Sequence, residues 1–383
     1  MPATLSLQDK EYRYRNMRAL MSRLGVDAMI CSGEGACKYI GGEFYNTRWV
    51  TMVMFADSDP VAFIALPGRE YLLTITKARE EDYWVKDTRI SSPPAIAALI
   101  RERLGAAARV GITLQSIPAA YYFGLCQCMP EVSFTDISDD FKAIYRVKTG
   151  NELTLLRRSP ESVDLCCRRT AEVLRPGWTE NQIWGEWEHI MRAMGSPDTL
   201  NQSNVHPRDI SAVLPNWCSS QRPLQKGDLM VAEITSSAGG YWTQKIETIS
   251  LGEPAAVVRE MNAAGAAAMN KAAAAVKPGV NARDLLHLMD DEIEAAGFLS
   301  PRGFLAGPQG HLSGLECDEG TFYLDQDFIL EEGMLFVLHP SVAVKGWTPG
   351  DYAIFGPGCM YLVTAEGAER LNKFHDDIIV IDC

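Results

Sequence analysis

The sequence predicts an α+β protein in two parts: a smaller α/β domain, then a C-terminal domain of two related halves around a cleft. An internal repeat supports the second part, because Pro176-Gly177 and Pro278-Gly279 each open a helical stretch and lie 102 residues apart. Helical stretches that alternate with β-branched stretches support the first part. The polar stretch Lys148–Glu152 separates them, so the expected domains are 1–148 and 149–383.

The first domain opens with a predicted helix over Asp9–Leu24, where apolar residues recur at helical spacing. Gly25 is expected to end it, because glycine tolerates the left-handed conformation that follows many helices. Strand-like stretches and one further helix then alternate. The expected strands are Asp27–Cys31, Val50–Phe55, Pro60–Leu66 and Arg109–Ile112, and the expected helix is Pro94–Leu104.

Each copy of the repeat has the same plan. A long helix, Glu152–Leu174 or Pro254–Val276, precedes the Pro-Gly turn. Thr179 or Asn281 then provides an N-cap for a second helix that ends at a glycine. Strand-rich sequence follows in both copies. We therefore expect a pseudo-twofold domain whose helices cover the outside of a curved antiparallel sheet.

The composition of the chain excludes several functional classes. Its net charge of −13 over 383 residues argues against affinity for nucleic acid or for anionic membranes. The N-terminus lacks a basic-then-apolar leader, and no apolar run approaches the length of a membrane span. The ten cysteines include no Cys-x-x-Cys pair. We expect a cytoplasmic protein with reduced thiols, in which the cysteines form neither a zinc framework nor disulfides.

Three polar segments interrupt the apolar strands of the second domain. Glu233 follows four apolar residues in a predicted hairpin, and a buried carboxylate is costly unless it is paired, liganded or protonated. Glycines bracket His311, as expected where backbone approaches a ligand. His339 ends an apolar strand, where it is either a core residue or part of a site edge. These three residues are the candidates for chemistry.

The order of these motifs resembles a known superfamily. Gly-Asp-Leu followed by an acid, Gly-Tyr, Gly-His-x-x-Gly-Leu and Glu-Glu-Gly-Met before a strand are similar to creatinase, prolidase and methionine aminopeptidase. The resemblance covers essentially the whole chain. It implies a pita-bread C-terminal domain, a creatinase-type N-terminal α/β domain and a homodimer.

In the peptidases of this superfamily, two Asp, one His and two Glu residues hold two metal ions. The matching positions here are Glu233, Gln244, His311, His339 and Gly358. Both carboxylates that bridge the metal ions are therefore replaced, by an amide and by a glycine. Because a dinuclear site needs bridging oxygens between its two cations, the resemblance implies that this centre is lost and that no cofactor is expected.

The resemblance also marks positions for substrate binding. A substrate-binding histidine of the peptidases is replaced by Asn216, and a second one by Asp318. Arg48 resembles the arginine with which creatinase-like enzymes hold a substrate carboxylate across the homodimer interface, a role that suits the guanidinium fork. Aromatic residues complete the expected pocket. They are Tyr241, Trp242 and Trp217.

These residues predict a creatinase-like hydrolase, not a peptidase, that cleaves a C–N bond in a small carboxylate-bearing molecule. His311 would be the general acid/base, and Glu233, His339 and Asp318 would orient it or the water. Three alternatives stay open. One is an elimination with Asp318 as base, because Leu315–Glu319 resembles a segment of dimethylsulfoniopropionate lyases. Another is a single Fe, Mn or Zn ion on Glu233, His311 and His339. The last is a catalytically inactive binding protein.

Overall fold

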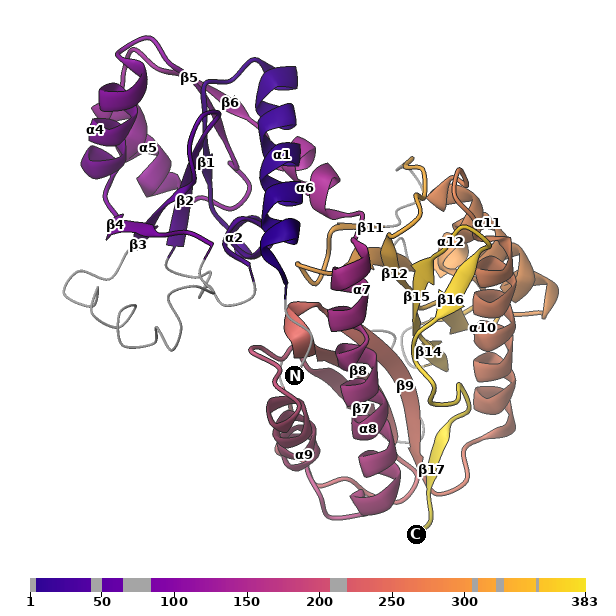
Figure 1. Cartoon of the computed structure of the whole chain (residues 1–383). Coiled ribbons are helices and arrows are strands. Elements are labelled where there is room, and N and C mark those ends of the chain that lie inside the picture. Colours follow the sequence, from indigo (N-terminus) through magenta and orange to yellow (C-terminus); the bar gives the residue numbers. More distant parts are fainter. Residues whose placement is uncertain are drawn as a thin grey trace. The chain divides into compact units, whose positions relative to one another are not determined.

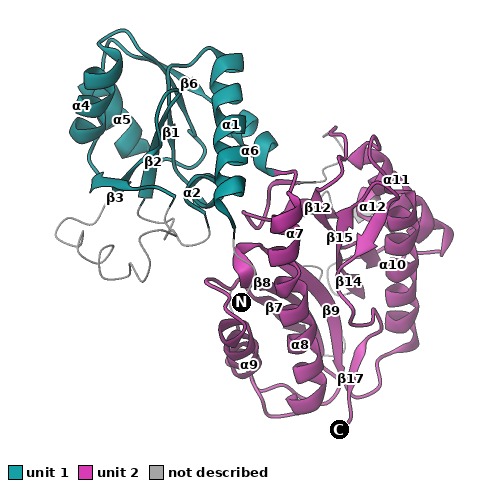
Figure 2. Ribbon diagram, in the orientation of Figure 1, with its two compact units in different colours: residues 1–145 teal, residues 146–383 magenta. Residues whose placement is uncertain are grey.

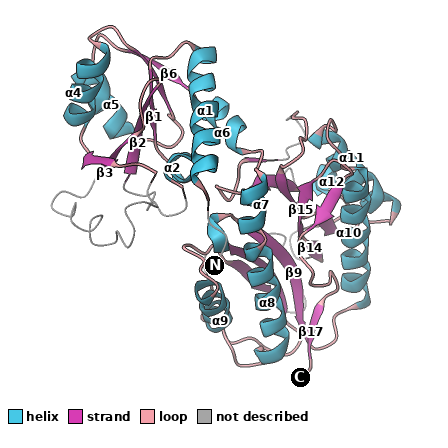
Figure 3. Ribbon diagram, in the orientation of Figure 1, coloured by secondary structure: helices cyan, strands magenta, loops and turns pink. Residues whose placement is uncertain are grey.

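The computed structural model describes residues 5–42, 50–64, 84–206, 219–304, 309–321, 327–348 and 351–383 (Figure 1). The chain forms two compact units, Met1–Tyr145 and Arg146–Cys383 (Figure 2). Both units mix helices and strands, which confirms the α+β class (Figure 3). Among the described residues, no helix has both the length and the apolar character needed to cross a bilayer.

The first unit is built on a six-stranded mixed sheet with the strand order β4-β3-β2-β1-β5-β6. Its strands are β1 (Ala28–Cys31), β2 (Val50–Phe55), β3 (Val61–Ile64), β4 (Asp87–Ile90), β5 (Arg109–Ile112) and β6 (Ser133–Asp136). Its helices are α1 (Leu7–Leu24), α2 (Glu34–Gly41), α4 (Pro93–Leu104), α5 (Ala119–Cys128) and α6 (Ser138–Tyr145). Helices α4 and α5 cover one face of the sheet and α1, α2 and α6 the other (Figure 1).

Helix α1 confirms the predicted first helix and its ends. Ser6 forms a capping box with Asp9, which satisfies free backbone groups of the first turn and starts the helix at Leu7. Gly25 ends the helix in the left-handed conformation, with φ 65°. The expected strands of this unit are also present, although the end of the third, beyond Ile64, lies outside the described residues.

The second unit contains the repeat as two sheets, each covered by a helix pair. The first sheet has the order β17-β9-β8-β7 and the second β11-β10-β12-β15-β16, with a two-stranded β13-β14 pair beside them. The first sheet comprises β7 (Gln202–His206), β8 (Leu229–Ser236), β9 (Thr243–Leu251) and β17 (Ile379–Ile381). The others are β10 (Gly310–Ser313), β11 (Gly320–Thr321), β12 (Leu335–Leu338), β13 (Ser341–Ala343), β14 (Ala353–Phe355), β15 (Cys359–Val363) and β16 (Ala368–Arg370).

The helices of this unit form two successive groups along the chain, one before the main strands of each sheet. They are α7 (Gly150–Leu156), α8 (Arg158–Val173), α9 (Glu180–Ala193), α10 (Ala256–Ala275), α11 (Ala282–Ala295) and the short α12 (Pro301–Phe304). Thr179 and Asn281 cap α9 and α11 through their side chains, as the repeat predicts. The glycines of the two Pro-Gly turns have nearly the same positive φ, 93° at Gly177 and 92° at Gly279. The pseudo-twofold repeat is therefore confirmed.

One predicted helix of the second unit is in fact two helices. The expected single helix over Glu152–Leu174 is interrupted at Arg157, between α7 and α8. Pro160 explains the break, because it has no N–H to donate to the carbonyl of Leu156 and its ring clashes with that group.

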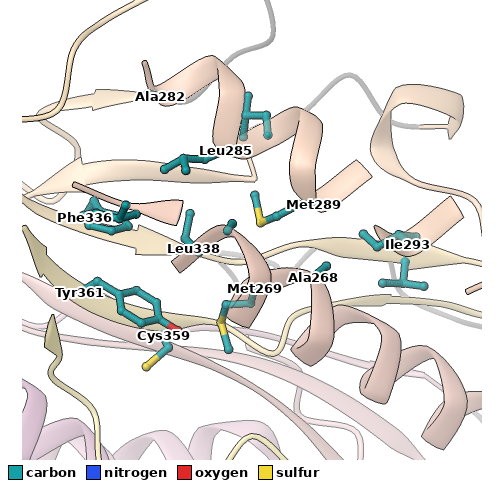
Figure 4. Close-up of a cluster of buried hydrophobic side chains, with 14 of the residues drawn as sticks. Ala268, Met269, Ala282, Leu285, Met289, Ile293, Phe336, Leu338, Cys359 and Tyr361 are labelled. Atoms are coloured by element: carbon teal, nitrogen blue, oxygen red, sulfur yellow. The ribbon is translucent and has the colours of Figure 1, made fainter. Parts of the chain in front are cut away.

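Each sheet of the second unit buries one face under its own helices. Helices α8 and α9 pack on β8, β9 and β17 through a core that includes Trp187, Ile234 and Leu251. Helices α10 and α11 pack on β10, β12 and β15 through a second core, whose buried residues include Met269, Met289 and Phe336 (Figure 4). These cores leave the opposite faces of both sheets available for polar residues.

Candidate functional site

The candidate site starts from the face of the first sheet that does not pack on helices. Side chains alternate along a strand, so Ala232 and Ile234 enter the core under α8 and α9 while Glu233 faces the other way. Glu233 lies opposite Gln202 on β7 and opposite Ile246 on β9. Gln244 lies opposite Thr235, the next residue of this face on β8. The register therefore places a carboxylate and two amides on one face.

Glu233 is a buried acid with an unusual protonation equilibrium. Its relative exposure is 8%, and Gln202 Nε2 donates a hydrogen bond to Glu233 Oε1 at 3.2 Å. Burial raises the pKa of Glu233 to about 7, because the charged carboxylate loses its hydration. Near neutral pH the group is therefore partly protonated, and it can both accept and release a proton.

His311 on β10 has a defined tautomer. Its Nδ1 lies 3.1 Å from the carbonyl oxygen of Leu312, and because a carbonyl only accepts, Nδ1 carries the proton. Burial lowers the pKa of His311 although the charge of Asp318 opposes that effect, so the ring is neutral. Nε2 then has a free lone pair and accepts from the Gln244 amide Nε2 at 3.0 Å. The amide thus engages the nitrogen that would otherwise ligate a metal ion.

His339 lies directly after β12 and is 2% exposed. Its ring centroid is 5.5 Å from that of His311 and 4.8 Å from that of Phe355. Burial, together with the neighbouring His311, lowers the pKa of His339 to about 3, which keeps the imidazole neutral. Its Nδ1 is buried, and no described residue forms a hydrogen bond with it. A buried polar atom of this kind is costly, and a polar group of a ligand would satisfy it.

Gly358 stands where the two sheets meet, and it has no room for a side chain. It exchanges backbone hydrogen bonds with Ile246, at 3.0 Å from its N–H and 3.3 Å to its carbonyl oxygen. A Cβ atom at Gly358 would overlap Ile246 Cδ1 and would lie 3.0 Å from His339 Cβ. The hydrocarbon of Ile246 therefore fills the space into which a carboxylate side chain at this position would extend.

The remaining candidate residues have other surroundings. Tyr241, which was expected to shape the pocket, lies two residues before β9, and its hydroxyl donates to Glu152 Oε1 on α7 at 2.9 Å. Trp242 is buried, and its backbone bonds to Gly314 and Ser313 in the His311 segment. Asp318 is exposed and accepts from the Gly320 N–H at 2.9 Å. Arg48, Trp217 and Asn216 lie outside the described residues.

Two residues with a place at the site escaped the sequence reasoning. Gln202 holds Glu233, and Gln244 engages His311, although the sequence marked Gln244 only as a lost metal ligand. No local sequence motif predicts either contact. The register of β7 on β8 brings Gln202 to Glu233, and the meeting of the two sheets brings Gln244 to His311.

The residues present do not fit the dinuclear centre typical of the peptidases that this chain resembles. At the position of one bridging carboxylate, the Gln244 amide is hydrogen-bonded to His311. At the position of the other stands Gly358, and Ile246 fills the space that a side chain there would need. Within the described parts of the chain, no three His, Cys, Asp or Glu side chains form a group that could hold a metal ion. Glu233, His311 and His339 thus do not meet as a ligand set in this structure.

Comparisons with known proteins agree with the fold. The chain is 26% identical to probable dipeptidase PepE from Mycobacterium tuberculosis over 379 residues, which cover 96% of each chain. It is 25% identical to an Xaa-Pro dipeptidase from Lactobacillus delbrueckii subsp. lactis over 334 residues, 84% of this chain and 88% of the relative. These relatives are named as peptidases.

Solved structures share the architecture at lower identity. A prolidase from Thermococcus sibiricus superposes with a TM-score of 0.82 at 17% identity, covering 98% of this chain and 99% of the prolidase. The N-terminal domain of FACT complex subunit SPT16 from chickpea has a TM-score of 0.74 at 12% identity, with coverage of 98% and 99%. These likenesses show the fold alone.

Family models match both units of the chain. The model for the creatinase/prolidase N-terminal domain matches residues 13–146, and that for metallopeptidase family M24 matches residues 154–380, more than half of the chain. With the repeat, the paired sheets and the inherited site positions, this match identifies the chain as a member of metallopeptidase family M24 that carries a creatinase/prolidase N-terminal domain.

Proposed function

We propose that this protein hydrolyses a C–N bond in a small carboxylate-bearing molecule, without a dinuclear metal centre, and that Glu233 moves the proton. The observation that carries the proposal is the hydrogen bond from Gln244 to His311 Nε2. It satisfies the histidine lone pair with a neutral amide, at positions where the peptidases of the family hold metal ions. C–N hydrolysis itself is the chemistry for which the dipeptidase relatives are named.

Glu233 has the properties that both proton transfers of such a hydrolysis need. As a carboxylate it takes a proton from a water molecule, whose oxygen attacks the carbon of the C–N bond. As the resulting acid it returns this proton to the leaving nitrogen when the bond breaks. A pKa of about 7 suits both steps at neutral pH. Gln202 holds one carboxyl oxygen and so fixes the orientation of the group.

The two histidines have supporting roles in this scheme. His311 keeps Gln244 in place through Nε2, and its lowered pKa keeps the ring uncharged. His339 Nδ1 is buried, has no hydrogen-bond partner in the described part of the chain and is available to hydrogen-bond a polar atom of the substrate. These roles differ from those expected from the sequence, where His311 was the acid/base. The change follows from the contact with Gln244, which occupies the lone pair that a base would use.

Arg48 is proposed to bind the carboxylate of the substrate, and Trp217 to contribute to substrate binding. The protein would be a homodimer in which each subunit contributes its Arg48 to the site of its partner. Arg48 and Trp217 lie outside the described residues. The support for this assignment is therefore the resemblance of Arg48 to the carboxylate-binding arginine of creatinase-like enzymes. A guanidinium binds a carboxylate through two parallel hydrogen bonds.

Hydrolysis in ¹⁸O water after chelator treatment tests the proposal. The candidates are small guanidino and amino acids, with dipeptides that end in proline as the peptidase comparison. We expect one ¹⁸O atom in the product of a small acid, loss of turnover in Glu233→Gln and full turnover in Glu331→Gln, the same change at an exposed site. Turnover of the dipeptides alone, and only with added metal, would show that the protein is a conventional peptidase.

A binding function without catalysis is the second candidate. The fold also occurs in the N-terminal domain of a FACT complex subunit, which is named for its complex and not for an enzymatic activity. Under this alternative, small acids would bind and raise the melting temperature without being consumed, and Glu233→Gln would bind them as well as the unchanged protein does.

A further inference from the structure

A fully buried ion pair lies behind the strand that carries His311. Lys148 near the start of the second unit pairs with Glu319, which follows β10, and both side chains are 0% exposed. Lys148 Nζ also donates to the carbonyl oxygens of Arg146 at 3.0 Å and Ser313 at 3.1 Å. Three acceptors thus match the three protons of the ammonium group, which compensates in part for its burial.

Glu319 is held at its side chain and at its backbone. Its Oε1 accepts from the Leu315 N–H at 2.7 Å, while its other oxygen pairs with Lys148. Its backbone carbonyl accepts from Arg146 Nε at 2.8 Å. Its backbone N–H donates to the carbonyl oxygen of Leu312 at 2.9 Å. The position of Glu319 therefore fixes that of the Leu312 carbonyl.

The Leu312 carbonyl is also the acceptor for His311 Nδ1. One oxygen thus receives the Glu319 backbone N–H and the His311 ring N–H. Lys148 holds the same strand a second time through Ser313. Close packing confirms how tightly the lysine is fitted, because a Cβ at Gly314 would overlap its Nζ and Cε atoms. A continuous path of direct contacts runs from the ion pair to the imidazole.

We infer that Lys148 and Glu319 are positioning residues for His311: their ion pair fixes the Leu312 carbonyl, which keeps the proton on Nδ1 and directs the Nε2 lone pair at Gln244. The inference rests on the proposed function for its catalytic consequence, but the tautomer of His311 can be observed without turnover. Outer partners of a functional histidine set its tautomer and orientation in this way in many proteins.

The alternative is that the pair serves stability alone, and a double replacement separates the two roles. Replacing a buried ion pair by apolar residues of similar volume is often neutral or stabilising, whereas removal of one partner leaves an unpaired charge. Lys148→Met with Glu319→Leu therefore removes the charges together. The matched control is Arg157→Met with Glu369→Leu, an exposed ion pair of the same unit.

The measurement is the ¹⁵N NMR spectrum of the histidine rings, with His311 assigned through the spectrum of His311→Gln. We expect the unchanged protein and the control to show His311 protonated on Nδ1 alone. In the double variant we expect a mixture of both tautomers and, where a substrate is turned over, a 10- to 100-fold fall in kcat with a smaller change in KM. If the double variant does not fold, Glu319→Gln, which keeps the shape of the side chain, replaces it.

A folded variant with the unchanged His311 tautomer would overturn the inference. If the tautomer shifts but no substrate is ever hydrolysed, the positioning role stands and the proposed function fails, so the two failures are distinct.

Discussion

Replacing Glu233 by Gln should make the protein more stable above neutral pH, although the substitution removes a site residue. The amide has the shape of the protonated carboxyl group and still accepts from Gln202. It carries no charge whose burial must be compensated. The stability of the variant relative to the unchanged protein should therefore depend on pH in a way that the structure specifies.

The sign and size of this effect follow from the pKa of Glu233. Burial raises it from 4.5 to about 7, so between these values the folded state binds more protons than the unfolded state. Folding stability therefore falls as pH rises through this window, by about 3 kcal/mol in total. The protein has a pI near 5.0, where solubility is poor, so pH 5.5 to 8 is the practical range. About 2 kcal/mol of the effect falls within it.

Urea unfolding at several pH values gives the free energies directly. The difference in the free energy of unfolding between Glu233→Gln and the unchanged protein should grow by about 2 kcal/mol from pH 5.5 to pH 8. All other titrating groups are shared by the two proteins, so their contributions cancel in this difference. Glu331→Gln, the same change at an exposed position, is the control for the substitution itself. If the Glu233→Gln difference does not change with pH, the pKa of Glu233 is ordinary and the acid/base role loses its basis.

Three further predictions concern the surroundings of the site. Gly358→Ala should cost about 1–3 kcal/mol of folding stability through overlap with Ile246, and Ile246→Val should offset part of that loss. Thermal unfolding measures both effects, and a double variant whose loss equals the sum of the two single losses would contradict this prediction. Gln244→Asp restores one bridging carboxylate only, so elemental analysis should find fewer than two tightly bound metal ions per chain, and two would refute the reasoning. Lys245→Met should cost about 3–5 kcal/mol, because it leaves the buried Glu247 carboxylate without its cation, whereas an unchanged urea midpoint would show that the pair contributes nothing.

The fold was largely accessible from the sequence because its signals are local and repeated. The two Pro-Gly turns and their N-caps recur at a constant offset, and both helices that they open are present. The break at Arg157, which Pro160 causes, was not predicted because the apolar pattern continues through it. The parallel pairing of β17 with β9 was equally inaccessible, because it joins residues such as Ile379 and Ile249 that are distant in the chain.

The site was accessible only in part, because its chemistry depends on contacts between strands. Glu233 and His311 stood out as polar residues in apolar segments, and both are buried. The sequence could not show that Gln244 donates to His311, since the partners come from different sheets. Nor could the sequence show that the Tyr241 hydroxyl bonds to a residue of α7, because the two residues are far apart in the chain. Lys148 gave no signal because its partner Glu319 is 171 residues away.

Metal content and turnover, measured on one chelator-treated preparation, test the central claim of hydrolysis without a dinuclear centre most directly. We expect C–N cleavage of a small acid to persist with far less than one metal ion per chain, to be insensitive to added Mn²⁺ and to disappear in Glu233→Gln. Activity that is lost on chelation and returns with two metal ions per chain would contradict the proposed mechanism.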